Sequence, residues 1–333
     1  VEEKPTGEIM LGAGVGTEGG TIGFSVSENN FMGKGVKLTA ALRLTEDTIR
    51  GNFSTITPNY KYSGKSLTTN IQSDVVDKLA ASGYQSQKTG FSFGTSLEQY
   101  EDLFFSPSFS TYYEHLTTDS TASANLKKQA GNYFETSFFY NLDYDKRNQK
   151  WQTSDGFRSK FTQSIPLVSE NWAMLNGYEY TKWIDFENDL ITKFSLYGRA
   201  KNSIIGENVR VSERLHVPRK KLKGFISRSI GPVDSTDYVG GNFAAAFNFS
   251  TTLPFLFESI EAADLKFFID AANLWGVDYR DNYNDSNKIR SSVGIAVDWF
   301  TPIGPLNFSL AQPISKVSTD KTESFQFNLG TTF

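Results

Sequence analysis

The sequence of 333 residues contains no cysteine, which excludes a disulfide framework, a thiolate metal site and a cysteine nucleophile. It also lacks any uninterrupted apolar run near the roughly 18 residues that a membrane-spanning helix requires. Neither sign of charge is in large excess, because 33 basic and 37 acidic side chains give a formal charge of −4. A nucleic-acid binder usually carries a clustered basic face, so this balance argues against nucleic acid as a partner.

Aromatic side chains are abundant, at 14% of the residues with 28 Phe and 15 Tyr, although only 38% of the chain is hydrophobic. A water-soluble core does not usually need that mixture. A transmembrane β-barrel accommodates it, because each strand needs only about ten residues of alternating polarity and aromatic girdles face the membrane interfaces. The composition therefore excludes helical membrane proteins and leaves the barrel open.

Alternation of apolar and polar residues with a period of two runs through the chain. In the last segment the intervening positions are polar or small, and the apolar ones are Phe325, Phe327, Leu329 and Phe333. Successive strand side chains point to opposite faces, so such a segment has one apolar face and one polar face. In residues 134–145 the polar face includes Glu135, Asp143 and Asp145, charges that a watery lumen accepts and a packed core does not.

These patterns predict an all-β protein, a transmembrane antiparallel up-and-down β-barrel of about 16 strands. An even number of strands places both chain ends on the periplasmic side. The predicted periplasmic turns are 29–34, 60–64, 97–101 and 301–304. The predicted strands are 7–16, 20–28, 35–46, 49–59, 65–76, 84–96, 102–117, 131–145, 156–166, 172–185, 190–202, 240–253, 264–274, 289–300, 305–313 and 322–333.

One connection, at about 203–239, is far longer than the others and is basic. Its basic side chains are Arg214, His216, Arg219, Lys220, Lys221, Lys223 and Arg228. The acidic residues at inward strand positions are Glu135, Asp143, Asp145, Asp270 and Asp298. Because opposite charges attract, we expect a long loop folded into the lumen. A solvated surface loop is the alternative.

Signatures of catalysis are missing from the sequence. It has no GxSxG, HExxH, P-loop or EF-hand pattern, so neither an enzyme nor a metal or cofactor site is predicted. Residues 14–19 match GxGxxG, but strand-like alternation resumes at Thr21, where a dinucleotide-binding fingerprint requires a helix. The motif is therefore interpreted as a hairpin turn.

Several short strings occur in a specific order and spacing. They are Thr6-Gly7-Glu8, Gly12-Ala13-Gly14-Val15-Gly16-Thr17-Glu18, Leu222-Lys223-Gly224-Phe225, Ser229-Ile230-Gly231-Pro232, Val239-Gly240-Gly241-Asn242, Phe267-Phe268-Ile269-Asp270, Ser292-Val293-Gly294-Ile295-Ala296, Pro302-Ile303-Gly304-Pro305-Leu306, Ala311-Gln312-Pro313 and the segment 325–333. Together they resemble the BamA family, the central barrels of the bacterial outer-membrane β-barrel assembly machinery. The resemblance covers essentially the whole chain.

This resemblance implies a barrel that inserts and folds outer-membrane β-barrel proteins by opening laterally between its first and last strands. It implies residence in the bacterial outer membrane. The implied partners are unfolded outer-membrane protein clients, accessory periplasmic lipoproteins, and outer-membrane lipids with lipopolysaccharide. The lipoproteins would dock on periplasmic POTRA domains that precede this chain, so residues 1–6 are expected to be the tail of such a domain and 7–333 the barrel. The alternatives are a two-partner secretion or autotransporter translocation barrel of the same superfamily, and a passive outer-membrane pore.

In the family the long loop carries an Arg-Gly-Phe motif, whose arginine lies in the lumen against acidic residues of nearby strands. Here the motif is Lys223-Gly224-Phe225. Strand register points Asp270 inward, where it matches one acidic partner, and Asn248 stands where the resemblance implies a glutamate. Lysine cannot form the bidentate fork of arginine. We therefore predict a single ion pair between Lys223 and Asp270.

A barrel closes by pairing its first strand with its last, here 7–16 with 322–333. On the first strand, Gly12, Gly14 and Gly16 fall on the inward face, where glycine weakens pairing or admits close approach of other backbone. The last-strand residues assigned to the seam are Phe325, Phe327, Asn328, Gly330 and Phe333. A weak seam exposes backbone groups that a client strand can satisfy by β-augmentation, which is the predicted mechanism of insertion.

Overall fold

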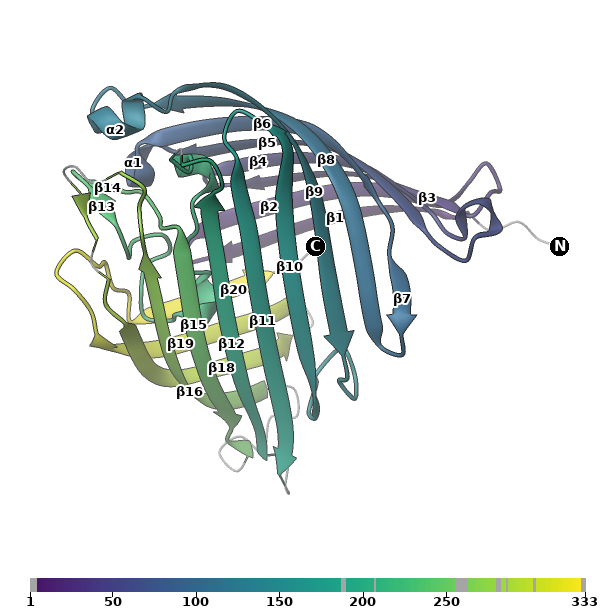
Figure 1. The fold of residues 1–333 in the computed structure, drawn as a ribbon. Coiled ribbons are helices and arrows are strands. Elements are labelled where there is room, and N and C mark those ends of the chain that lie inside the picture. Colours follow the sequence, from purple (N-terminus) through teal and green to yellow (C-terminus); the bar gives the residue numbers. More distant parts are fainter. Residues whose placement is uncertain are drawn as a thin grey trace.

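The structure is a computed structural model of the chain, and it describes residues 5–186, 190–206, 208–254, 263–279, 283–285, 287–301 and 304–330. Within these ranges the chain winds into a closed antiparallel β-barrel of 16 strands, as predicted (Figure 1). No helix in the described part of the chain is long or apolar enough to cross a membrane.

Consecutive strands of the wall pair antiparallel, and β1 pairs with β20 to close the ring. The wall strands are β1 (Gly7–Gly16), β2 (Gly19–Phe31), β3 (Val36–Thr45), β4 (Thr48–Thr57), β5 (Leu67–Lys78), β6 (Tyr84–Gly94), β8 (Leu103–Thr118), β9 (Gly131–Asp145), β10 (Gly156–Ser169), β11 (Ala173–Phe186), β12 (Leu190–Ser203), β15 (Phe243–Thr252), β16 (Ala263–Trp275), β18 (Arg290–Thr301), β19 (Gly304–Ser315) and β20 (Phe325–Gly330).

Short strands and helices lie in the connections between wall strands. Three short strands form a small sheet in which β13 (Val233–Asp234) pairs with β14 (Asp237–Tyr238) and with β17 (Tyr283–Asn284). The helices are α1 (Leu79–Ser82), α2 (Ala124–Lys127) and the 3-10 turns η1 (Tyr60–Tyr62), η2 (Val211–Glu213) and η3 (Arg219–Lys221). Figure 1 shows α1, α2, β13 and β14 together at one end of the barrel, with the N-terminus at the other.

The wall forms because its strands meet lipid on one face and the lumen on the other. Along β2, Ile22, Phe24 and Val26 are exposed on the outside, whereas Ser25 and Ser27 are buried toward the lumen. Aromatic rings on the outer face of β6, β8, β9 and β10 contact one another with centroids 5.0 to 6.1 Å apart. These ring pairs are Phe93 with Phe109, Phe109 with Phe138, Phe138 with Tyr140, and Tyr140 with Phe161.

The predicted strands match the wall within a few residues, but one predicted turn is wrong. Residues 97–101 contain β7 (Leu97–Tyr100), which continues the line of β6 along the 16-residue strand β8. Leu97 pairs with Phe105 of β8, so strand pairing continues through residues whose composition is typical of a turn. The small sheet, α1 and α2 were not predicted. The predicted strand end at Phe333 and residues 1–4 of the predicted tail 1–6 lie outside the described residues.

The apolar interior lies between the long loop and the wall. One buried cluster joins the loop to β12, β15 and β16, and a second joins it to α2, β6 and β8. The second cluster comprises Tyr84, Leu116, Ala122, Leu126, Val211 and Val239. The lumen is thus partly filled by this chain's own loop, which positions the site described next.

Candidate functional site

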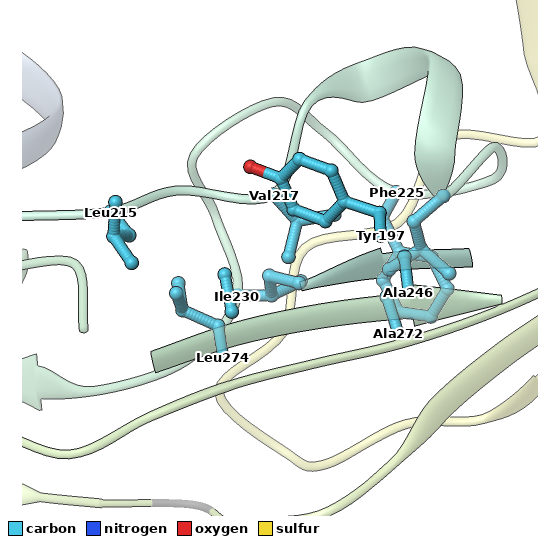
Figure 2. Packing of buried hydrophobic residues seen from close by; sticks show 10 residues of the cluster. Tyr197, Leu215, Val217, Phe225, Ile230, Ala246, Ala272 and Leu274 are labelled. Carbon is cyan, nitrogen blue, oxygen red and sulfur yellow. The ribbon is translucent and has the colours of Figure 1, made fainter. Parts of the chain in front are cut away.

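The long loop, residues 204–242, folds into the lumen as predicted. Its apolar side chains pack on the inward faces of β12, β15 and β16, where alanines leave room for them (Figure 2). Phe225 and Leu222 are only 2% and 3% exposed. The cluster consists of Tyr197, Leu215, Val217, Leu222, Phe225, Ile230, Ala244, Ala246, Ala272 and Leu274.

The loop motif lies against the two predicted wall residues. The Lys223 Nζ atom is 2.7 Å from Asp270 Oδ2, and the backbone N–H of Lys223 donates to the same oxygen at 3.1 Å. The Asn248 amide donates to Asp270 Oδ1 at 2.8 Å and to the carbonyl of Lys221 at 2.8 Å. Both oxygens of the fully buried Asp270 therefore have donors, and an amide occupies the place of a second carboxylate.

Gly224 lets the motif approach the wall closely. Its φ is +86°, a left-handed conformation that side chains disfavour. A Cβ atom there would lie 3.0 Å from the Cβ of Ala311 and 3.4 Å from that of Ser292. The next residue, Phe225, then points into the apolar cluster. Sequence reasoning selected these three motif residues, and the structure brings them together with Asp270 and Asn248.

A second anchor, not predicted from the sequence, holds the start of the loop. Arg210 is 1% exposed and forms ion pairs with Glu114 of β8 at 3.3 Å, Glu135 of β9 at 3.3 Å and Glu213 at 2.7 Å. Lys201 of β12 reaches Glu213 at 3.0 Å. Burial opposes ionisation of Glu213, but Lys201 and Arg210 outweigh it and hold the pKa of this carboxyl below its ordinary value.

Only part of the predicted attraction between the basic loop and the acidic wall is present. Glu135 and Asp270 do bind the loop, through Arg210 and Lys223. The other three acidic residues pair with nearer cations instead, because neighbouring residues of the wall and its turns supply them. These pairs are Asp143 with Arg158 at 2.5 Å, Asp145 with Arg147 at 2.6 Å and Asp298 with Lys266 at 2.6 Å.

The loop is also hydrogen-bonded to the segment that leads into β20. The N–H of Glu323 donates to the carbonyl of Gly224 at 3.0 Å, and the N–H of Ile226 donates to that of Lys321 at 3.0 Å. On β20 itself, the Gln326 side chain donates to the carbonyl of the motif phenylalanine at 3.2 Å. The last strand is therefore held by the loop as well as by β19.

Arg219 of the same loop contacts both sides of the seam. Its guanidinium lies 3.2 Å from Glu18 and donates to Thr17, both in the turn after β1. The same group lies 2.7 Å from Glu323, just before β20. One loop side chain thus bridges the two strands that close the barrel.

The described part of the seam contains three residue pairs. Within the described residues, β1 pairs with β20 only over Gly14–Gly16 and Asn328–Gly330, whereas it pairs with β2 along all 10 of its residues. One further backbone bond runs from the Thr17 N–H to the Phe327 carbonyl at 3.1 Å. Phe325 lies outside this pairing and contacts the ring of Phe308 on β19. Paired backbone keeps polar groups away from lipid. Over the described residues, the β1–β20 junction has the fewest backbone pairs of the wall.

Glycines bring the two strands of the seam close together. A Cβ atom at Gly16 would lie 2.7 Å from the carbonyl of Phe327, and one at Gly14 would lie 3.0 Å from that of Leu329. Gly330 has a φ of +144°, and a Cβ there would meet the Cα of Gly14. Of the two roles that the sequence left open for these glycines, close approach fits this geometry. Gly12 pairs with Gly23 of β2. On the side facing the last strand, the register of Gly12 leads to residues after Gly330, which lie outside the described residues.

Replacing Arg219 by glutamine is expected to loosen the seam. The change removes two ion pairs, but Glu18 is half exposed, so solvent screening limits the effect to about 1 kcal/mol. That corresponds to a roughly fivefold larger open population. Hydrogen exchange of the β1 segment around Thr17 should accelerate accordingly. The matched change Arg50→Gln removes an exposed pair with Asp74 away from the seam and should leave that exchange unaltered; equal acceleration in both variants would contradict the assignment.

Comparison with known proteins gives the family. The sequence profile of the Omp85 superfamily domain matches residues 30–333. This chain belongs to the Omp85 superfamily. The matched range contains the wall from the end of β2 onward, the loop motif and the last strand with Gly330, whereas β1 with Gly12, Gly14 and Gly16 precedes it.

Two curated relatives of this Omp85 barrel carry the name outer membrane protein assembly factor BamA. The protein of Neorickettsia risticii is 24% identical over 346 residues, which cover 100% of this chain and 46% of the relative. The protein of Neisseria meningitidis serogroup B is 25% identical over 392 residues, which cover 99% of this chain and 47% of the relative. The chain thus spans about half the length of the curated relatives it matches.

A solved structure shares the Omp85 barrel fold. The crystal structure of BamA from Haemophilus ducreyi lacking POTRA domains 1–3 matches with a TM-score of 0.92 at 24% identity, and the match covers 100% of this chain and 71% of that one. The resemblance to the BamA family inferred from the short strings is therefore confirmed, as is the barrel fold. The Omp85 barrel is located in the bacterial outer membrane.

Proposed function

We propose that this chain is the membrane barrel of an outer-membrane protein assembly factor, which inserts and folds client β-barrel proteins in the outer membrane. The names of the curated relatives and the Omp85 domain support this assignment. The proposal includes no enzymatic step. The driving free energy comes from the client, which buries apolar strand faces in lipid and pairs its backbone as it folds.

The observation that carries the proposal is the limited pairing between β1 and β20 over the described residues, three residues on each strand. Separating these strands breaks few described backbone pairs, compared with the full-length pairing of β1 and β2. Once separated, the edge of β1 presents N–H and C=O groups to an incoming strand. A client strand that adds to this edge satisfies its own backbone at each step, so no polar group of the pair faces lipid unpaired.

The contacts of the loop favour release of β1 over release of β20. Its backbone and the Gln326 side chain hold β20, whereas β1 is tied to the loop through the turn that carries Thr17 and Glu18. Release of Arg219 from that turn frees β1 while β20 stays attached to the loop. We therefore propose that β1 provides the free edge and that the Lys223 motif keeps the last strand in place.

The proposed partners follow from this mechanism and from the relatives. Unfolded outer-membrane proteins are the clients, and outer-membrane lipids with lipopolysaccharide surround the barrel. Accessory periplasmic lipoproteins would act through POTRA domains outside this chain, which spans about half of its curated relatives.

Cross-linking tests whether a client strand meets the edge of β1. A photoreactive amino acid at Val15 of the full-length protein is expected to form an adduct with a client during its assembly. The same amino acid at Ile49 of β4 is the control, because the two side chains are 49% and 50% exposed but β4 is paired on both sides. Adducts of equal yield at both positions, or none at Val15, would remove the support for templating on β1.

A further inference from the structure

A basic cavity of about 430 Å³ lies in the lumen beside the loop motif. Its wall comes from β10, β11, β12, β15 and β16, and loop residues around the motif border it. Seven basic side chains and two carboxylates line this cavity. Both carboxylates already have cationic partners, since Asp270 pairs with Lys223 at 2.7 Å and Glu179 with Arg199 at 3.4 Å. The cavity therefore carries a large excess of positive charge.

Four of the lining ammonium groups form no ion pair with a described carboxylate. Among the described residues, no carboxylate lies within ion-pair distance of Lys160, Lys193, Lys220 or Lys221. Lys193 lies among the like charges of Lys266, Lys221 and Lys223, against which Asp298 is the opposing charge. Glu179 and Asp270 attract Lys221 from beyond ion-pair distance, and its Nζ donates to the Ser195 hydroxyl at 2.8 Å. Crowding cations in a confined space costs free energy unless an anion compensates them.

The two carboxylates that pair with Lys160 in strand register already bind other cations. Lys160 is the strand partner of Asp143 on one side and of Glu179 on the other. Asp143, however, is bound by Arg158 at 2.5 Å, and Glu179 by Arg199. Neither register neighbour is therefore available to compensate the charge of Lys160.

The spacing of the free cations favours an extended ligand over a single small anion. Lys160 is on β10 and Lys193 is on β12, two strands across and four residues along the strands in register, which together correspond to about 17 Å. Lys220 and Lys221 approach from the loop. In an extended peptide, alternate side chains lie about 7 Å apart on one face. Two or three carboxylates at that interval can meet several of these lysines together.

The wall separates the cavity from lipid headgroups. Strands β10, β11, β12, β15 and β16 pair with one another without interruption next to the cavity. The lining residues Arg158 and Lys160 lie at the start of β10, and Arg147 precedes it, at the barrel end away from α1 and α2.

We propose that this lumenal cavity binds an acidic peptide segment, extended and carrying two or more carboxylates. The proposal goes beyond strand addition at the seam, because the binding residues lie on other strands and do not require the seam to open.

Peptide binding to the purified full-length protein in detergent micelles tests this proposal. The probe is a Gly-Asp-Gly-Asp-Gly-Asp peptide with a neutral fluorophore, and its counterpart replaces every Asp by Asn. Fluorescence anisotropy is expected to show at least tenfold tighter binding of the Asp peptide, weakening as salt is raised. Equal affinities of the two peptides for the wild-type protein would overturn the proposal, whether or not any variant folds.

Two matched double variants locate the binding. Lys160→Gln with Lys193→Gln removes two cavity charges and is expected to weaken the Asp peptide at least tenfold. Lys34→Gln with Lys65→Gln removes two exposed charges from turns outside the cavity and should change nothing. Unaltered binding in the cavity variant, or full displacement of the peptide by an equal concentration of inorganic phosphate, would overturn the proposal. The same binding measurement is made on protein whose seam is locked by a disulfide. Binding that persists there shows that the cavity takes the peptide without the seam opening on which the proposed function depends.

Discussion

A disulfide between positions 15 and 329 is expected to abolish client assembly, and reduction is expected to restore it. Val15 and Leu329 are Cα partners in the seam. Directly opposed residues of antiparallel strands lie about 4.5 to 5.5 Å apart, within the range that a disulfide spans. The covalent bond prevents β1 from leaving β20 but replaces no residue of the loop. Both cysteines are introduced into a sequence that has none, so no other thiol of this chain competes.

The measurement is the rate at which a client barrel becomes folded in liposomes that contain the full-length protein and its accessory subunits. With the seam locked, the rate should fall to that of liposomes without the protein. The control places cysteines at Ile22 and Leu44, which are partners across β2 and β3 and also exposed on the outer face. If the locked seam supports assembly at the unlocked rate, lateral opening is not the working step and the lumen or loop must carry the function.

Replacing Arg210 by methionine is expected to release the first half of the loop from the lumen. The change leaves the carboxylates of Glu114, Glu135 and Glu213 buried without their shared guanidinium. Removing one partner from a buried charge network costs about 3–5 kcal/mol. The population with a released loop should therefore rise roughly a hundredfold to several thousandfold. Trypsin cleavage within the loop of the folded barrel measures that population, because cleavage tracks the open fraction when reclosing is fast.

Two comparisons separate this effect from a general loss of charge. Arg50→Met removes an arginine whose side chain is 50% exposed and paired with Asp74, so it should change cleavage little. Adding Glu114→Gln to Arg210→Met should recover part of the protection, because one uncompensated carboxylate is then gone. Loop cleavage at the wild-type rate in Arg210→Met would show that this network does not hold the loop.

The wall could be predicted from the sequence because lipid outside and water inside impose a period of two on every strand. Strands β1 and β9 begin and end at the predicted residues, 7–16 and 131–145. The glycines of the first strand were found for the same reason, since they fall on one face of that alternation. β7 was missed because turn composition and strand extension coexist in residues 97–100.

Some residues of the site could be predicted from the sequence, and others could not. Placing Lys223 beside Asp270 needed both strand register and the family resemblance, because 47 residues separate them. Arg210 carries no such signal. Its wall partners are distant in the chain, with Glu135 75 residues away, and the path of the loop decides which arginine becomes buried. The bridging role of Arg219 depends on that same path.

Arg219 also bears on the order in which the barrel itself folds. It follows Thr17 by 202 residues and precedes Glu323 by 104. Closing a chain over a long contour costs conformational entropy that grows with the logarithm of its length, and pairing the chain ends is the longest such closure in this barrel. A docked loop divides that closure into two shorter ones and holds both ends near a single guanidinium. Strand pairing at the ends then becomes a late local step, so the edge proposed to receive clients is the last part of the barrel to form.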